Sequence, residues 1–142
     1  LLERIIVDAN FEGEIQDKKV VLRHCDNAHI IADPVLLRSA LENVIRNALR
    51  YSPECTEVTV SLTTEAGHLI IQVEDQGPGV PEQSLDRLFE PFARIDKARD
   101  RNSGGFGLGL AITGRVVQAH GGRVWAENRS EGGLRIVMSL PT

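Results

Sequence analysis

Two asparagines lie one helical turn apart in the most regular segment of the chain. Residues 34–51 carry apolar side chains at helical spacing, and Asn43, Asn47, Arg50 and Tyr51 lie on the opposite side of the predicted helix. Asn is a mediocre helix former, and its side-chain carbonyl oxygen suits a Mg²⁺ ion that is held mainly by water and phosphate. Arg50 adds a cation for phosphate oxygens, and Tyr51 offers a flat face for a base. From this helix alone, a solvated polar face explains the pattern as well.

A carboxylate follows the second strand of a predicted hairpin. The apolar alternation of residues 69–73 places Asp75 on the same inward face. A buried carboxylate is costly unless it is paired or hydrogen-bonded, and residues 73–77 supply no cation, so its partner must come from elsewhere. The exocyclic amine of adenine is a suitable donor, and Gly77 and Gly79 would let the backbone approach a flat ring closely. The alternative is an ordinary turn, because Asp-x-Gly and Gly-Pro-Gly are common turn sequences.

Glycines precede the last predicted helix. Residues 104–110 read GGFGLGL, so that several backbone N–H groups and the positive end of the helix can face an anion. The loop before them, residues 93–103, has a local charge of +2, because two acidic residues oppose four basic ones: Arg94, Lys97, Arg99 and Arg101. A basic loop beside a glycine-rich helix start predicts a lid over phosphates. A hinge and simple solvated charge are the alternatives.

Helical and strand periods alternate along the chain. They predict a helix to about Asp17, strands at Lys19–His24 and His29–Ala32, a helix over 34–51 that is capped by Asp33, a hairpin over Thr56–Thr63 and 69–73, a short helix at Leu85–Phe89, a helix over Gly107–His120, and strands at Arg123–Glu127 and Leu134–Leu140. This order favours a two-layer α/β sandwich with a mixed or mostly antiparallel sheet.

The composition and net charge of the chain argue against several classes of function. The chain has 142 residues with 16 Lys and Arg against 20 Asp and Glu, and this net charge of −4 argues against nucleic acid or an anionic membrane as the main partner. Two isolated cysteines form no disulfide framework, which fits a reducing, cytoplasmic setting. There is no P-loop sequence, and no apolar run is long enough to span a membrane. The chain starts without Met, so we expect it to be one domain, residues 1–142, of a longer protein.

Four motifs in order resemble the catalytic, ATP-binding domain of bacterial sensor histidine kinases, in the superfamily that also holds gyrase-type, Hsp90-type and MutL-type ATPases. They are the N box LENVIRNALRYSP (41–53), the first glycine box DQGPG (75–79), the F box LFEPF (88–92) and the second glycine box GGFGLGL (104–110). Residues 98–105 and 132–137 resemble most the envelope-stress sensor kinases of the Cpx type. The resemblance implies a Bergerat-type ATP-binding fold, with a mixed sheet beneath about three helices.

The resemblance also implies a role for each matching residue, with ATP and Mg²⁺ as the bound molecules. Asn47 would ligate Mg²⁺, Asn43 and Arg50 would contact phosphates or the metal shell, and Asp75 would accept the adenine amine. The remaining implied roles are stacking on adenine (Tyr51), shaping the adenine pocket (Gly77, Gly79), anchoring the lid (Phe89, Phe92), reaching the phosphates (Arg99, Arg101) and cradling the triphosphate (Gly105, Gly107, Leu108, Gly109).

One position distinguishes the ATP-hydrolysing members of this superfamily from this chain. The hydrolysing ATPases carry Glu four residues before the metal-binding Asn, whereas this chain carries Asn43, and an amide cannot act as a general base. We therefore expect a phosphodonor that does not hydrolyse ATP rapidly. In the family the phosphate acceptor is a His on a separate dimerisation domain, and none of the four histidines here has that context.

The resemblance then implies partners and a location for the whole protein. This chain would be a monomer that contributes no nucleophile or base, and the full receptor would be a homodimer in the bacterial inner membrane that signals to a response regulator. A free-standing anti-sigma-type serine kinase and a non-catalytic nucleotide-sensing module are the alternative functions.

Overall fold

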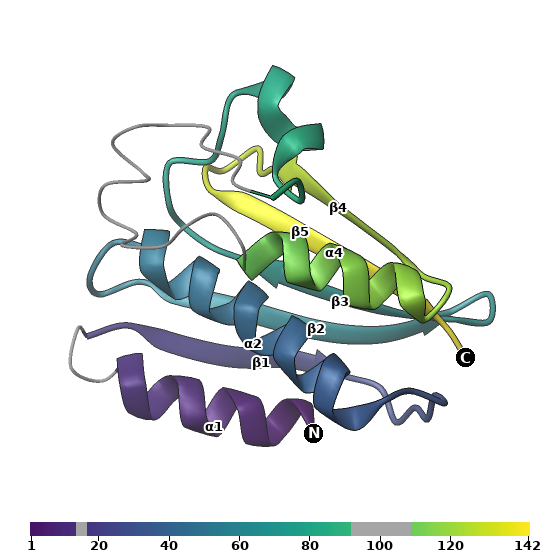
Figure 1. Ribbon diagram of the computed structural model, residues 1–142. Helices are drawn as coiled ribbons and strands as arrows, with labels where there is room; N and C mark the ends of the chain where they lie inside the picture. The colour runs from purple at the N-terminus through teal and green to yellow at the C-terminus, as the bar shows by residue number, and fades with distance from the viewer. Residues whose placement is uncertain (14–16, 92–108) are drawn as a thin grey trace.

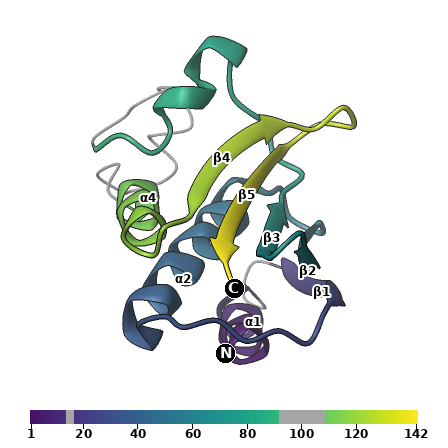
Figure 2. The ribbon, with the colours of Figure 1, turned by 90° about the vertical axis from the view of Figure 1, so that its right-hand side faces the viewer.

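The computed structural model describes residues 1–13, 17–91 and 109–142. Its five strands form one sheet in the order β1-β2-β3-β5-β4, and helices α1, α2 and α4 cover one face of it (Figures 1 and 2). The elements are α1 (Leu2–Gly13), β1 (Lys19–Cys25), α2 (Pro34–Tyr51), β2 (Glu57–Glu65), β3 (His68–Glu74), the 3-10 helix η2 (Glu82–Arg87), α4 (Gly109–Ala119), β4 (Arg123–Asn128) and β5 (Leu134–Pro141). Only β1 and β2 pair in parallel within this part of the chain, so the predicted mixed, mostly antiparallel sandwich is confirmed.

Helix α2 forms where local sequence signals agree. Asp33 caps it, because its Oδ1 accepts hydrogen bonds from the backbone N–H groups of Val35 at 3.0 Å and Leu36 at 3.1 Å. Pro34 occupies the first turn, where its missing N–H costs nothing. The helix buries one broad apolar face against the sheet and the neighbouring helices: Leu37, Ala40, Leu41, Val44, Ile45, Ala48 and Leu49. The predicted bounds of this helix are confirmed.

Strands β2 and β3 form the predicted hairpin. Ala66 and Gly67 at its tip both have positive φ, 50° and 79°, which suits the right-handed twist of the strands they join. The register pairs Glu65 with His68 and continues to Thr59 with Glu74. Because alternate side chains point to opposite faces, Leu69, Ile71 and Val73 are buried beneath the helices, and the residue after β3 starts on that buried side.

Three predicted elements differ from the structure. Residues 29–32 form no strand, because they pair with no other described segment, and the Ile31 side chain is fully exposed. The first helix ends at Gly13 rather than near Asp17, which has a φ of 53°. The short helix expected at 85–89 lies over Glu82–Arg87 and is a 3-10 helix. The other predicted helices and strands are found within a few residues of their predicted ends.

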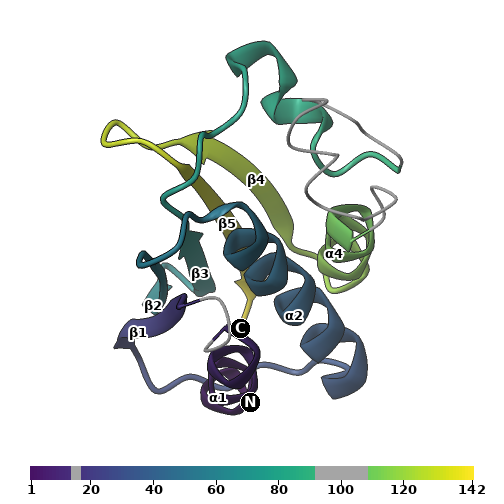
Figure 3. The same ribbon diagram turned by 90° about the vertical axis from the view of Figure 1, so that its left-hand side faces the viewer.

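The core lies between the helices and the sheet. Ile5 of α1, Val44 and Ile45 of α2, and Met138 of β5 belong to one buried cluster. Helices α2 and α4 lie side by side on the sheet (Figure 3), α2 over β2 and β3 and α4 over β5 and β4. The Thr113 hydroxyl of α4 donates to the Ala40 carbonyl of α2 at 2.9 Å. In the described part of the chain, no helix is long and apolar enough to cross a bilayer.

Candidate functional site

Asn43, on the polar side of α2, lies beside the start of α4. Asn43 and Asn47 are partly exposed on α2, and Arg50 is exposed at its end. A Cβ on Gly109, the first residue of α4, would lie 3.4 Å from Oδ1 of Asn43. The structure therefore brings two of the predicted residues, Asn43 and Gly109, close together.

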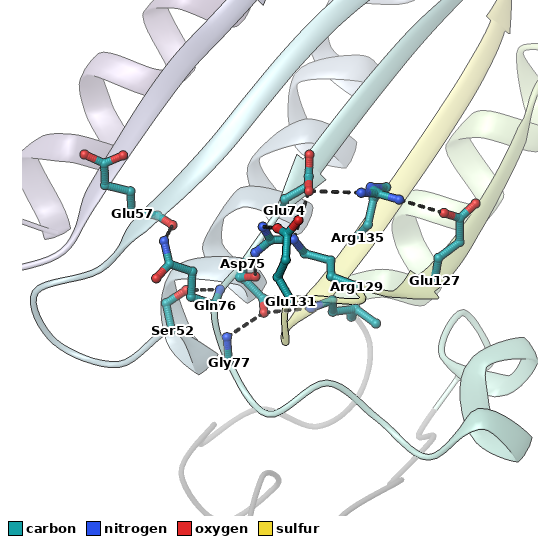
Figure 4. Close-up of polar contacts among 11 residues, drawn as sticks. Ser52, Glu57, Glu74, Asp75, Gln76, Gly77, Glu127, Arg129, Glu131 and Arg135 are labelled. Atoms are coloured by element: carbon teal, nitrogen blue, oxygen red, sulfur yellow. Dashed lines mark hydrogen bonds and ion pairs between the residues drawn. The ribbon is translucent and has the colours of Figure 1, made fainter.

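Asp75 is buried at the end of β3, with 2% of its surface exposed. Its Oδ1 accepts hydrogen bonds from the backbone N–H groups of Gly77 at 2.9 Å and Leu134 at 3.1 Å. The backbone N–H of Asp75 also donates to the Leu134 carbonyl at 2.9 Å. The predicted burial of Asp75 is confirmed, and the described hydrogen bonds orient its carboxylate between the loop that follows and the start of β5 (Figure 4).

The two glycines after Asp75 touch other parts of the protein. A Cβ on Gly77 would lie 2.5 Å from the backbone carbonyl oxygen of Tyr51, so the loop passes directly against the end of α2. Gly79 has a φ of +70°, and a Cβ there would lie 2.6 Å from Oδ1 of Asn128. Close approach within the chain is thus enough to require both glycines. Their part in an adenine pocket stays a prediction.

Further contacts tether the segment from Asp75 to Val80. The Gln76 N–H donates to the Ser52 hydroxyl at 3.3 Å, just beyond α2. Arg129 donates from Nη1 to the Asp75 carbonyl at 2.8 Å. Asn128 bonds to both the N–H and the carbonyl of Val80. Asn128 and Arg129 carry no signal in the sequence that predicts this role, because an Asn-Arg pair after a strand is an ordinary start of a turn.

Charged side chains link β3, β4 and β5 beside this loop (Figure 4). Glu74 forms ion pairs with Arg129 at 2.9 Å and Arg135 at 3.3 Å, and Arg135 reaches Glu127 at 3.1 Å. A hydrogen bond from Trp125 lowers the pKa of Glu127 below its ordinary value, and Arg135 lowers it further although burial acts in the opposite direction. This network fixes the chain around Asp75 from the side opposite α2.

The F box and the second glycine box are described only in part. Phe89 is half-buried and packs on the core, and its Cβ would lie 3.4 Å from a Cβ on Gly114 of α4. The other residues predicted for the lid and the triphosphate cradle lie outside the described residues: Phe92, Arg99, Arg101, Gly105, Gly107 and Leu108.

The described residues thus form a site from three segments: the C-terminal half of α2, the loop after β3 and the first residue of α4. The loop contacts the end of α2 at Tyr51 and Ser52. The first residue of α4 contacts α2 at Asn43. The site offers amide oxygens, a cation at Arg50 and an oriented buried carboxylate. These groups suit a ligand with anionic, metal-bound and heteroaromatic parts.

Comparisons with known proteins agree with this arrangement. Residues 32–142 match the family described as "Histidine kinase-, DNA gyrase B-, and HSP90-like ATPase". The sensor histidine kinase CpxA of Escherichia coli (strain K12) is 42% identical over 142 residues, which cover 99% of this chain and 31% of that protein. The chain therefore spans about a third of the length of the curated relatives it matches.

Solved structures show the same fold. The mycobacterial sensor histidine kinase MprB matches with a TM-score of 0.84 and 30% identity over 99% of this chain and 91% of that chain. Full-length ShkA in complex with AMPPNP matches with a TM-score of 0.84 and 26% identity over 99% of this chain and 29% of that chain. The chain belongs to the family of histidine kinase-, DNA gyrase B- and HSP90-like ATPases, and within it to the type of ATP-binding catalytic domain found in sensor histidine kinases.

Proposed function

We propose that this domain binds Mg-ATP and donates the γ-phosphoryl group to a histidine on a separate dimerisation domain, which then passes it to an aspartate of a response regulator. The proposal rests on the burial and orientation of the Asp75 carboxylate. This carboxylate is buried, is oriented by the N–H groups of Gly77 and Leu134, and lies where the loop meets the end of α2. Family membership supports ATP as the nucleotide.

An oriented, buried carboxylate selects for a hydrogen-bond donor. The edge of adenine presents an exocyclic amine at the position where guanine presents a carbonyl oxygen. A carboxylate accepts from the amine and repels the carbonyl, so Asp75 would favour ATP over GTP. The backbone carbonyl of Tyr51 lies against the same loop, and its aromatic ring would stack on the base.

Asn47 is the residue that would hold Mg²⁺. Among residues 1–13, 17–91 and 109–142, no three His, Cys, Asp or Glu side chains come together to form a metal cage. A single amide oxygen on the polar side of α2 fits an ion whose other ligands are phosphates and water. When bound, Mg²⁺ neutralises charge on the phosphates during transfer.

Asn43 explains why the domain would keep ATP for transfer. It lies one turn before Asn47 and beside Gly109, but its amide cannot take a proton from water. We therefore propose slow ATP hydrolysis by this chain alone, and a nucleophilic histidine supplied by another domain. Full-length ShkA, whose structure matches this chain, is in complex with AMPPNP, and this supports a nucleotide as the ligand. We also propose that the whole protein lies in the inner membrane, with this domain in the cytoplasm, and the likeness to sensor histidine kinases supports this.

The test is a titration with ATP and with GTP in the presence of Mg²⁺. Asp75→Asn keeps an acceptor oxygen for Gly77 and Leu134, yet it replaces the negative charge, so ATP affinity is expected to fall by about 10- to 100-fold and the preference over GTP to shrink. Asp8→Asn on α1 removes the same charge away from the site and is the matched control. Unchanged ATP affinity in Asp75→Asn would refute this assignment of Asp75.

A further inference from the structure

Asn128 and Val80 form a reciprocal pair of hydrogen bonds between the end of β4 and the loop after β3. The Val80 N–H donates to Oδ1 of Asn128 at 3.0 Å, and Nδ2 of Asn128 donates to the Val80 carbonyl at 2.6 Å. Val80 is buried in the core, with 7% of its surface exposed. The amide of Asn128 therefore acts like one residue of a neighbouring strand, and it fixes the backbone of Val80 in both directions.

This pair closes a loop that is fixed at its other end by different residues. Asp75 is held by Leu134 and by Arg129, whose Nη1 donates to the Asp75 carbonyl. Between Asp75 and Val80 the chain has no helix or strand. The first half of the loop is also held at Gln76, which donates to Ser52, and at Gly77, which donates to Asp75. Asn128 holds the second end, at Val80.

Gly79 also depends on Asn128. A Cβ on Gly79 would lie 2.6 Å from Oδ1 of Asn128, so the amide occupies the space beside the glycine that a side chain would need. Glycine and amide thus fit each other. The amide contacts the loop directly at Val80 and approaches it at Gly79.

We propose that Asn128 is a positioning residue for nucleotide binding: it holds the loop from Asp75 to Val80 so that Asp75 and the two glycines face the base. This inference rests on the proposed function, because it assigns the loop to the base of ATP. Asn128 itself touches no nucleotide in this account. It acts through Val80 and Gly79.

The chemistry of the pair gives a selective test. The Val80 backbone needs one acceptor and one donor, and a neutral amide supplies both. Asn128→Asp keeps the shape but, when ionised, offers two acceptors and faces the Val80 carbonyl with negative charge. When protonated, the introduced carboxyl supplies one donor and one acceptor again. Because the ionised form is disfavoured there, the pKa of the introduced carboxyl is expected to rise above its ordinary value of about 3.9.

The chain contains a matched control. Asn10 of α1 makes the same reciprocal pair with Val20 of β1: its Oδ1 accepts from the Val20 N–H at 2.6 Å and its Nδ2 donates to the Val20 carbonyl at 3.0 Å. Asn10→Asp therefore places a carboxylate against a backbone carbonyl, that of Val20, in the same fold. It does so at α1 and β1, away from the loop after β3.

The experiment is a titration of AMPPNP with Mg²⁺ at pH 8 and pH 5, each variant being compared with the unmodified chain at the same pH. Circular dichroism first verifies that each variant is folded. For Asn128→Asp we expect about tenfold weaker binding at pH 8, since a lost hydrogen bond to a polar group corresponds to roughly that factor, and recovery to within about threefold at pH 5. Asn10→Asp should bind within about twofold of the unmodified chain at both pH values.

Asn128→Ala keeps the test decisive if the aspartate variant does not fold at pH 8. It removes both hydrogen bonds without adding charge, so it should weaken binding equally at pH 8 and pH 5. Near-normal binding by a folded Asn128→Asp at pH 8, or an equal loss in Asn10→Asp, would overturn the inference while leaving the proposed function intact. If the unmodified chain binds no AMPPNP at all, the proposed function fails, and the inference fails with it.

Discussion

Asp75 and Leu134 exchange two hydrogen bonds at the end of the sheet where the inner strand β3 ends and β5 begins. The Leu134 N–H donates to Oδ1 of Asp75 at 3.1 Å, and the Asp75 N–H donates to the Leu134 carbonyl at 2.9 Å. One bond continues the antiparallel ladder, and the other holds the carboxylate of the candidate nucleotide site. The same residue therefore completes the sheet and presents a ligand group.

This double role predicts that stability and binding can be separated at Asp75. Asp75→Ala leaves the buried N–H of Leu134 and the N–H of Gly77 without that acceptor, and the free energy of unfolding should fall by about 1–3 kcal/mol. Asp75→Asn keeps an acceptor oxygen and should lose less than half as much. Urea denaturation measures both. Equal losses in the two variants would show that the negative charge, and not the acceptor, stabilises this end of the sheet.

Asn47→Ala should affect nucleotide binding only when Mg²⁺ is present. Loss of a metal ligand is expected to weaken Mg-ATP binding by about 10- to 100-fold, whereas ATP affinity in EDTA should change little. Calorimetric titration in Mg²⁺ and in EDTA gives the two values. Asn27→Ala, an exposed asparagine between β1 and α2, is the control. A loss of the same size in EDTA would rule out the metal role.

A hydrogen bond from Thr113 links α4 to α2, and Thr113→Val should remove it. The side chain is fully buried, and its hydroxyl donates to the Ala40 carbonyl at 2.9 Å. Valine keeps the shape and loses the hydrogen bond, so the free energy of unfolding should fall by about 1 kcal/mol. Thr63→Val on the partly exposed part of β2 should change it by less than about 0.5 kcal/mol. If both substitutions have the same effect, the hydroxyl does not link the helices.

Trp125→Phe should change how stability depends on pH. The Trp125 indole N–H donates to Glu127 at 2.9 Å and is the largest cause of the lowered pKa of Glu127. A carboxyl whose pKa is lowered by folding adds stability above its unfolded pKa of about 4.3, and this stability is lost as the pH falls through the lowered pKa. Trp125→Phe removes part of the stability that Glu127 contributes in this way.

The free energy of unfolding of Trp125→Phe should therefore fall furthest below that of the unmodified chain near pH 7, and the difference should be smaller near pH 3. Urea denaturation at the two pH values measures it. Any loss of packing by the indole adds an offset that is the same at both. A difference that does not change with pH would mean that the hydrogen bond does not shift the titration of Glu127.

The sequence alone predicts the elements whose signals are local. Helix α2 carries its cap at Asp33, its proline at the first turn and one continuous apolar face, so its bounds follow directly. The β2–β3 hairpin carries its alternation and its Ala66-Gly67 turn, and the same alternation predicts the burial of Asp75. Each of these features depends on neighbours in the chain, which the sequence displays.

Features that depend on distant partners are not predictable in this way. Residues 29–32 alternate in burial as a strand does, with Ile30 partly buried and Ile31 exposed. No second strand among the described residues lies beside them to supply hydrogen bonds. Asn128 bonds to Val80, which lies 48 positions earlier. Nothing in its own surroundings distinguishes it from an ordinary turn residue.

A structure of the chain with AMPPNP and Mg²⁺ would show where the base binds. We predict that the exocyclic amine of adenine lies within hydrogen-bond distance of the Asp75 carboxylate, about 2.7–3.2 Å, with the phosphates extending toward Asn47 and the start of α4. A base bound elsewhere, for example in the groove between α1 and α2 lined by Asp8, Glu42 and Arg46, with no contact to Asp75, would contradict this prediction.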